Sequence, residues 1–289
     1  MKILITGGQG FVGKNLFDYL KGTYQIENPG RQKLNLLDSD KTFRYLKKNK
    51  FDVIVHTAVY DAVAVGSTND PAKVLEFNLK MFFNLVRAQN FFGKMIYFGS
   101  GAEFNRSNWK SKMKEDYYDA HMPVDQYGLS KYIMTQYALS HEKIYTLRLF
   151  GVFGKYDDCK TRVIPNLCSL AAMNLPLVID QNKYYDYLYV EDLAKIIRWF
   201  IEHKPKKKVY NVCTGQTIDF RTIARKIIKI SGKKLSLKVK KKGLGREYSG
   251  DNHLLLSEIK SFRFTPMDLA LKSVYNWCNQ NENEYQSSH

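Results

Sequence analysis

Near its amino terminus the chain reads Lys2-Ile-Leu-Ile-Thr-Gly-Gly-Gln-Gly-Phe-Val-Gly13, an apolar run followed by a glycine-rich turn. Lys2 to Thr6 has the length and composition of a buried strand, and Phe11 to Leu20 has helical spacing. Three glycines between a first strand and a first helix allow a tight turn and the close approach of a pyrophosphate, whose charge suits the helix N-terminus. We therefore predict a dinucleotide-binding turn, with cofactor contacts at Gly7, Gly10, Phe11, Val12 and Gly13.

Strand and helix patterns alternate along the rest of the first half of the chain. Nearly continuous apolar runs and segments of helical spacing follow one another, which is typical of a parallel sheet covered on both faces. The expected strands are 24–26, 51–56, 94–98 and 145–150, and the expected helices are 38–50, 72–91 and 125–139. The predicted fold class is α/β, a doubly wound parallel sheet of the Rossmann type with a smaller C-terminal substrate lobe.

Beyond Phe150 the alternation becomes less regular, which indicates a second lobe. We expect the dinucleotide-binding domain to span 1–165, with 184–215 returning to it, and the substrate lobe to consist of 166–183 and 216–289. The elements expected here are helices at 164–173, 191–203 and 220–230 and strands at 177–179, 187–190, 209–212 and 235–239.

The chain is strongly basic, with a formal charge of +17 over 289 residues. Between Lys204 and Lys242 there are fourteen Lys or Arg residues and one acid, Asp219, but hardly any aromatic side chains that could stack on bases. This favours a lysine-rich surface, or attraction of an anionic small substrate, over nucleic-acid binding. No apolar stretch has the length of a membrane span, and the four cysteines lack metal-ligand spacing. We expect a cytoplasmic protein with reduced thiols, no membrane or nucleic-acid partner and no metal.

Tyr127 and Lys131 lie four residues apart in the predicted helix, so they share one helix face. A cation beside a phenol lowers the pKa of the tyrosine and makes it a usable general acid or base. Ser100 follows the predicted strand Lys94 to Phe98 at its C-terminal end, where ligands bind in a doubly wound sheet. We predict that Ser100, Tyr127 and Lys131 form one catalytic group.

The segment after the second strand bears on the choice of cofactor. NAD sites usually place an acid at the end of this strand, to bind the ribose hydroxyls. Here the sequence is Ile26-Glu-Asn-Pro-Gly-Arg31, in which Glu27 comes too early and Arg31 offers a cation for a ribose 2′-phosphate. We predict NADP rather than NAD. His56 ends a buried strand without a paired acid, so it is expected to be structural.

Taken together, these motifs resemble those of the extended short-chain dehydrogenases/reductases of the NAD-dependent epimerase/dehydratase family, over nearly the whole chain. The segment Arg31 to Asp38 resembles the branch of GDP-L-fucose synthase and dTDP-4-dehydrorhamnose reductase, where an arginine faces the NADPH phosphate. The matching positions are Thr6–Gly13, Asn35–Asp38, His56–Ala58, Asn78, Gly99-Ser100, Tyr127–Lys131, Arg148–Gly154, Val163–Pro165 and Asp186–Asp192.

The resemblance implies roles for the matching residues. Tyr127 would exchange a proton with the substrate, Lys131 would also hold the nicotinamide ribose, and Ser100 would hydrogen-bond the reacting oxygen. Further cofactor contacts are implied at Asn35, Leu36, Thr57 and Ala58.

This chain departs from the family pattern at two positions. Gly151 stands where the family often has asparagine, and Tyr185 stands where an arginine before Asp186 commonly binds the nucleotide diphosphate. We expect other cations to supply the missing charge, and the segment 104–121 to form a loop over the site. The predicted substrate-binding residues are Ala102, Arg162, Tyr185 and Arg246.

The function expected from the resemblance is NADPH-dependent reduction of a nucleotide-activated 4-keto-6-deoxy sugar, with a homodimer as the expected assembly. One alternative is an NAD-dependent nucleotide-sugar 4-epimerase that keeps its cofactor bound. A 4,6-dehydratase fits less well, because the Gly-Ser100-Gly-Ala segment lacks the acid pair of that branch. A non-catalytic dinucleotide-binding sensor or assembly factor is the alternative from another class.

Overall fold

The computed structural model describes residues 1–62 and 67–281 of the chain. Its centre is a parallel sheet of six strands in the order β10-β5-β4-β3-β1-β2. The order reverses between β1 and β3, which are neighbours in the sheet, and the carboxyl ends of the strands meet at one edge, where such sheets bind ligands. The strands are β1 (Lys2–Thr6), β2 (Gln25–Glu27), β3 (Phe51–His56), β4 (Phe92–Ser100), β5 (Ile144–Leu149) and β10 (Val209–Val212). The predicted fold class is confirmed.

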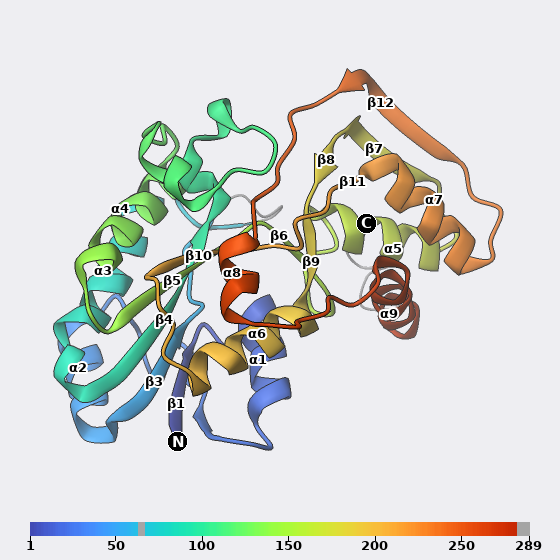
Figure 1. Cartoon of the computed structure of the whole chain (residues 1–289). Coiled ribbons are helices and arrows are strands. Elements are labelled where there is room, and N and C mark those ends of the chain that lie inside the picture. Colours follow the sequence, from blue (N-terminus) through green and yellow to red (C-terminus); the bar gives the residue numbers. More distant parts are fainter. Residues whose placement is uncertain (63–66, 282–289) are drawn as a thin grey trace.

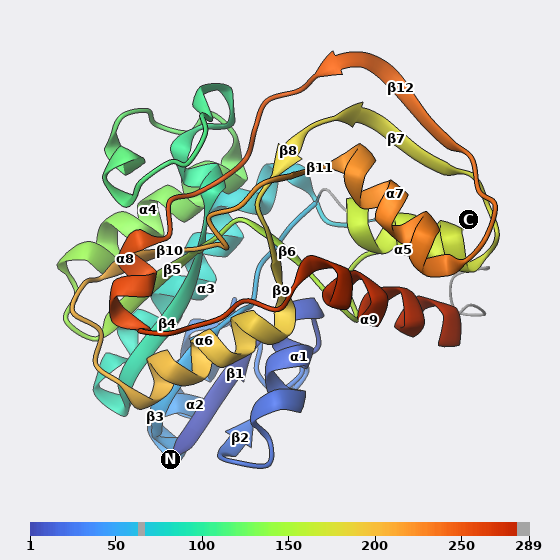
Figure 2. The same ribbon diagram turned by 45° about the vertical axis from the view of Figure 1, so that its right-hand side comes forward.

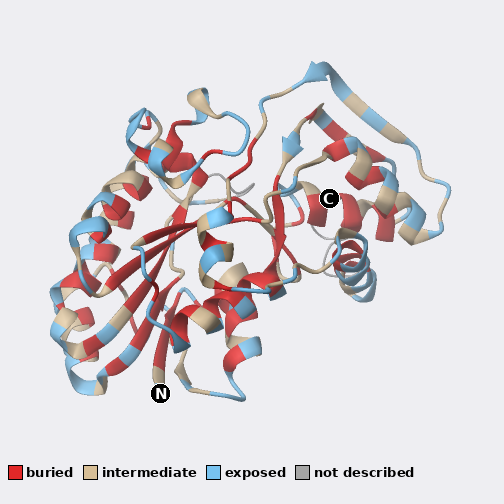
Figure 3. Ribbon diagram, in the orientation of Figure 1, coloured by how far each residue is buried: buried red, intermediate tan, exposed pale blue. Residues whose placement is uncertain are grey.

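Helices cover both faces of this sheet (Figures 1 and 2). Three of them enclose one core with Leu46, Phe82 and Met134: α2 (Ser39–Asn49), α3 (Val74–Arg87) and α4 (Gln126–Ser140). Three others enclose a second core with Leu16, Ile197 and Leu255: α1 (Phe11–Leu20), α6 (Val190–Glu202) and α8 (His253–Glu258). The central strands are buried almost throughout, as Figure 3 shows, which explains their continuous apolar sequences.

A second lobe packs around its own core beside the sheet. Three helices surround this core: α5 (Val163–Ala172), α7 (Phe220–Ser231) and α9 (Met267–Gln280). Small paired strands complete it: β6 (Gly151–Phe153) with β9 (Tyr187–Tyr189), β8 (Tyr184–Tyr185) with β11 (Ile218–Asp219), and β7 (Leu177–Asn182) with β12 (Leu237–Leu244). Figure 2 shows β7 and β12 as a long ribbon arching over α7.

The chain passes repeatedly between the two lobes. Asp186, between β8 and β9, is fully buried and accepts hydrogen bonds from the main-chain N–H groups of Thr214 and Gly215 at 2.8 and 2.7 Å. After β12 the chain returns to the sheet, where α8 packs beside β10. The segment 216–289 was expected to lie in the second lobe, so the position of α8 differs from that expectation. Residues 282–289 of that expected segment lie outside the described residues.

Local sequence explains where several helices begin. Asp38 and Asp125 cap α2 and α4, and each carboxylate accepts a hydrogen bond from a main-chain N–H of the first turn.

The helix expected at 72–91 is shorter than predicted, because turns of 3₁₀ helix precede and follow α3, at Pro71–Lys73 and Gln89–Phe91.

The basic side chains of the segment 204–242 are mostly exposed, some beside strand β10 of the sheet and the others on the second lobe. Lys240, Lys241 and Lys242 are part of the exposed edge strand β12, and Lys241 pairs with Asp180 at 2.9 Å. Charged side chains on an edge strand protect it from pairing with other chains. Among the described residues, no helix is long and apolar enough to cross a membrane.

Candidate active site

The glycine turn after β1 has the close packing that the sequence predicted. Gly7 has a φ of +68°, and a Cβ atom there would lie 2.6 Å from the backbone of Ala58. A Cβ at Gly13 would lie 2.5 Å from the Gly7 carbonyl oxygen, whereas at Gly10 this oxygen, at 3.3 Å, is the only neighbour within 4 Å. Helix α1 has no side-chain cap and no acid in its first turn, so its N-terminal amides suit an anion. The turn thus fits the pyrophosphate of a dinucleotide.

The three predicted catalytic residues come together at the carboxyl end of β4. Ser100 is the last residue of β4, and its side chain lies beside the Tyr127 phenol, whose pKa it acts to lower. The Lys131 ammonium lies 5.7 Å from the centre of the Tyr127 ring and donates to the Phe98 carbonyl oxygen at 2.8 Å. Lys131 is 5% exposed, because α4 packs this face onto β4. The arrangement places a phenol, a hydroxyl and an ammonium around one point.

The ionisation of this group differs from the expectation. Burial raises the pKa of Tyr127 above its usual value, and the Ser100 side chain opposes the shift only in part. Burial also lowers the pKa of Lys131 to about 8, against the opposing effect of the charges on Glu103 and Asp61. The predicted lowering of the Tyr127 pKa by Lys131 is therefore wrong, because removal of water from the phenol dominates its pKa and the cations that oppose this shift are Arg162 and Arg106. At neutral pH Tyr127 carries a proton that it can donate.

The end of β2 offers no free acid to a cofactor ribose. Glu27 forms an ion pair with Lys2 at 3.0 Å and accepts a hydrogen bond from the Tyr45 hydroxyl. Asn28 follows it and donates to the Gly8 carbonyl oxygen at 3.3 Å. Arg31 is exposed, and it shows no hydrogen bond or ion pair to the parts of the chain that the structure describes. A cation is thus available on this side of the turn.

The other predicted cofactor residues line the same end of the sheet. Thr57 donates its main-chain N–H and its hydroxyl to the Thr6 carbonyl oxygen at 3.2 and 2.7 Å, which holds the end of β3 against the turn. Asn35 is half-buried in the connection between β2 and α2, whereas Leu36 is 6% exposed and belongs to the core beneath. His56 is buried and hydrogen-bonded to Thr6 at 2.8 Å, and burial lowers its pKa to about 3. Its structural role agrees with the prediction.

The predicted substrate residues are brought together only in part. Tyr185 in β8 is half-buried, and the charge of Arg162, at the start of α5, acts on both Tyr127 and Tyr185. Arg246 is exposed, and it is not among the described cations whose charge affects the pKa of Tyr127 or Tyr185. The side chain of Ala102 is buried, because the residue is 1% exposed. Its contact with the site is its main-chain N–H, which donates a hydrogen bond to the Ser100 hydroxyl at 3.2 Å.

Arg106 is a site residue that sequence reasoning missed. Its charge acts on Tyr127, Tyr185 and Tyr248, and its guanidinium lies 5.4 Å from the Trp109 ring. An ion pair with Asp125, at 3.4 Å, holds it near the start of α4. The segment 104–121, expected to cover the site, thus supplies a cation near Tyr185, where the family arginine is absent.

Tyr248 is the second residue that was missed. It lies in the segment after β12, is 7% exposed and stacks on Trp109 with 4.1 Å between ring centres. The Ser100 side chain acts on the pKa of this phenol too, and the ring fills the space that a side chain at Gly101 would occupy, 2.6 Å from a Cβ there. The only sequence signal was an aromatic residue close after the basic strand.

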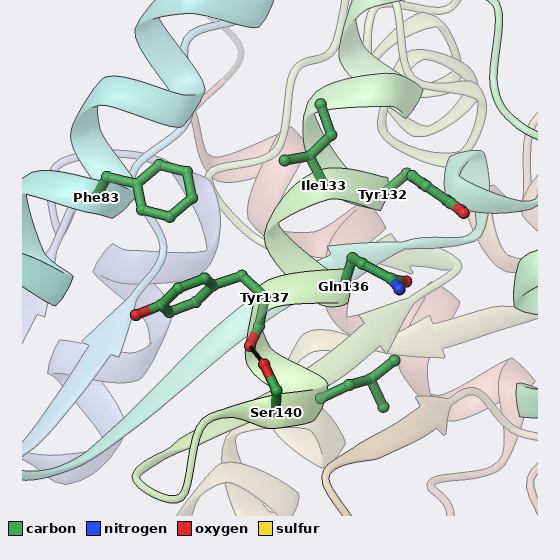
Figure 4. Close-up of a pocket in the computed structure, with 7 residues that line it drawn as sticks. Phe83, Tyr132, Ile133, Gln136, Tyr137 and Ser140 are labelled. Carbon is green, nitrogen blue, oxygen red and sulfur yellow. Dashed lines mark hydrogen bonds between the residues drawn. The ribbon is translucent and has the colours of Figure 1, made fainter.

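A hollow on the surface lies away from these residues, between the outer sides of α3 and α4. Figure 4 shows Phe83 beside Tyr137, whose rings pack edge to face at 5.2 Å, and Ile133 and Gln136 of α4 also line the hollow. Its lining contains none of the predicted site residues, so it is not part of the candidate active site.

The expected homodimer stays a prediction.

Comparison with known proteins gives a consistent result. The profile described as "NAD dependent epimerase/dehydratase family" matches residues 3–213. The GDP-L-colitose synthase of Yersinia pseudotuberculosis is 27% identical over 282 residues, which cover 89% of this chain and 91% of that protein.

Two solved structures illustrate the similarity of fold. A GDP-L-fucose synthetase from Naegleria fowleri bound to NADP has a TM-score of 0.82 at 18% identity, covering 98% of this chain and 94% of that one. A UDP-glucose 4-epimerase from Thermus thermophilus in complex with NAD has a TM-score of 0.80 at 20% identity, covering 96% and 99%. Because the family profile spans most of the chain, this protein belongs to the NAD dependent epimerase/dehydratase family and is an NAD(P)-dependent enzyme of the extended short-chain dehydrogenase/reductase type.

Proposed function

We propose that this protein is an NADPH-dependent reductase of a nucleotide-activated keto sugar, with a 4-keto-6-deoxyhexose as the expected sugar. The observation that carries the proposal is the convergence of Ser100, Tyr127 and Lys131 at the carboxyl end of β4. The protonated phenol of Tyr127 suits donation to a carbonyl oxygen, which is the direction of reduction. The GDP-L-colitose synthase and the NADP-bound GDP-L-fucose synthetase support this choice by similarity.

Each residue has a defined task in this reaction. A reduced nicotinamide, when bound, supplies the hydride for the carbonyl carbon. Tyr127 gives its proton to the carbonyl oxygen, while the Ser100 hydroxyl hydrogen-bonds that oxygen and stabilises the charge that develops on it. The Lys131 ammonium stabilises the phenolate that remains.

The preference for NADPH is supported by the end of β2. Glu27 is engaged by Lys2 and Tyr45, so its carboxylate is not available to ribose hydroxyls. Arg31 is exposed, and a guanidinium can bind a 2′-phosphate through paired hydrogen bonds. NADPH is therefore the proposed reductant.

The reaction can be tested with a panel of nucleotide-linked 4-keto sugars. We expect one of them to cause oxidation of NADPH, with a higher kcat/KM than with NADH. Absorbance of the reduced nicotinamide follows the reaction, and a mixture without sugar nucleotide is the blank. Interconversion of two C4 epimers without added cofactor, and without consumption of NADPH, would instead identify a 4-epimerase.

Binding of the substrate diphosphate gives a separate prediction. Arg106 and Arg162 both act on Tyr127 and Tyr185, so they flank the reacting group from two different elements. We expect Arg106→Ala and Arg162→Ala each to raise the substrate KM about tenfold or more, the loss of a charge-assisted hydrogen bond, with a smaller change in kcat. Steady-state kinetics would measure both constants.

The matched control is Arg225→Ala, which removes an exposed guanidinium of α7 in the same basic lobe. A rise in KM equal to that of Arg106→Ala would show that general attraction, and not a specific contact, is responsible. An unchanged KM for both Arg106→Ala and Arg162→Ala would contradict the assignment of the diphosphate to this place.

A further inference from the structure

A buried carboxylate lies directly behind the candidate active site. Glu103, in the 3₁₀ turn Gly101–Phe104, is 0% exposed. Its Oε1 atom accepts a hydrogen bond of 2.8 Å from the main-chain N–H of Ser100, and its Oε2 atom lies 3.0 Å from Nε of Arg148. The carboxylate thus joins the end of β4 to an arginine in the interior of β5.

The surroundings are shaped for this carboxylate. A Cβ at Gly99 would lie 2.4 Å from Glu103 Oε1, so the glycine before Ser100 leaves the space in which the carboxylate crosses β4. Gly99 is the register partner of Arg148 on β5. Arg148 is itself 0% exposed and donates to Asn211 of β10 at 3.1 Å. Three neighbouring strands therefore take part in holding Glu103.

Glu103 and Lys131 bond the same short piece of β4, because the carboxylate accepts from the Ser100 N–H and the ammonium donates to the Phe98 carbonyl oxygen, each at 2.8 Å. The charge of Glu103 acts on Lys131 across this segment. Five titratable groups face this ammonium: Glu103 from the turn after β4, Asp61 from the segment after β3, His56 from β3, Tyr97 from β4 and Tyr127 from its own helix. Among the described residues, Glu103 and Asp61 are the acids whose charge favours the protonated amine, and burial of the amine opposes them. Burial also raises the pKa of Glu103 itself, while the Arg148 guanidinium and the Ser100 N–H favour its charged form. His56 is neutral because burial lowers its pKa to about 3, and the two phenols are protonated because burial raises their pKa values.

We propose that Glu103 is a positioning residue of this active site, whose buried carboxylate fixes the main chain of Ser100 and supplies negative charge that stabilises the Lys131 ammonium. A single group then sets both the place of the hydroxyl and the charge of the amine. The inference rests on the proposed roles of Ser100 and Lys131, but its main readouts need neither substrate nor cofactor.

The first readout is the titration of Lys131 in the folded protein. Competitive acetylation of Lys131 over a pH series, followed by mass spectrometry, gives the midpoint at which the amine becomes reactive. In the wild-type protein burial places the pKa of Lys131 at about 8. Glu103→Gln removes a charge that raises this pKa, so the midpoint is expected to fall by about one pH unit. Glu103→Asp keeps the charge and is expected to keep the midpoint.

The second readout is hydrogen exchange of the Ser100 amide. Both variants weaken the bond to this N–H, since glutamine lacks the charge and aspartate is shorter. The amide is expected to exchange about tenfold faster or more in each, as for loss of a hydrogen bond to a charged group. Glu103→Asp retains an ion pair for Arg148, so the hydrogen-exchange measurement can be made on this variant if Glu103→Gln does not fold.

The matched control is Glu115→Gln. Glu115 is a half-buried carboxylate of the same region and accepts a hydrogen bond from the Asn211 N–H at 2.8 Å, but it bonds neither Ser100 nor Lys131. It is expected to leave both readouts unchanged. If Glu103→Gln gave the same Lys131 midpoint as Glu115→Gln, the electrostatic role would be refuted, and unchanged Ser100 exchange in Glu103→Asp would refute the positioning role.

Turnover separates this inference from the proposed function. If a keto-sugar substrate is found, Glu103→Gln is expected to lower kcat more than it changes KM. As the pH is raised, this variant is expected to lose its activity at a lower pH than the wild type. The sign follows from the protonated amine being the active form, which disappears as pH rises through the pKa. If no keto sugar is reduced, the proposed reaction fails while the Lys131 and Ser100 readouts still decide on Glu103.

Discussion

Tyr127→Phe is expected to lower kcat by about 10²-fold or more, the range of lost general acid–base catalysis, while binding of NADPH stays close to that of the wild type. The substitution removes only the phenol oxygen beside Ser100, so the packing of the ring between α4 and its neighbours is kept. Steady-state turnover of the substrate and a fluorescence titration with NADPH would measure the two effects. The expected pattern is a loss in kcat with little change in cofactor affinity.

Tyr137→Phe is the matched control, because Tyr137 lies ten residues further along α4 and lines the outer hollow of Figure 4. It should leave turnover unchanged. Turnover of Tyr127→Phe within a few-fold of the wild type would exclude Tyr127 as the proton donor and would direct attention to Tyr248, the other phenol on Ser100.

Arg148→Met is expected to destabilise the protein by about 3–5 kcal/mol, the cost of leaving one member of a buried ion pair without its partner. Both Arg148 and Glu103 are 0% exposed, and their closest atoms lie 3.0 Å apart. Urea unfolding followed by circular dichroism would give the loss as a lower midpoint at unchanged slope. A well-packed double variant, Glu103→Leu with Arg148→Met, is expected to recover part of the stability, because no buried charge remains.

The contrasting variant is Arg198→Met, which removes an arginine that also pairs with a glutamate, Glu202, at 2.9 Å. This pair is exposed on α6, so water replaces the lost partner and the unfolding midpoint should hardly move. Equal losses in the two variants would show that burial does not determine the contribution of the Arg148 pair.

The sequence was sufficient for the fold and for three residues of the site. Strand and helix periodicity identified the strands of the central sheet, because parallel strands buried on both faces read as continuous apolar runs. Ser100, Tyr127 and Lys131 could be brought together by reasoning alone, since the end of one strand and the start of the next helix meet at the same edge of such a sheet.

The rest of the site lies on segments without periodic patterns. Arg106 comes from the irregular stretch 104–121, and Tyr248 comes from a connection that returns from the second lobe. Nothing in their spacing shows that they meet near Tyr185. Arg148, in contrast, gave a signal that could have been used, because an arginine inside an otherwise apolar strand implies a buried acid nearby.

The path of the chain between the lobes limits how the specificity of this enzyme can be exchanged with that of a relative. The three helices of the second lobe lie on separate stretches of the chain, 163–185, 216–248 and 267–280. The Asp186 carboxylate joins the flanks of the first two stretches by bonds to Thr214 and Gly215. Helix α8 lies between the second and third stretches but packs on the sheet. A chimera that takes its substrate lobe from another member of the family must therefore replace all three stretches together and leave α8 with the recipient.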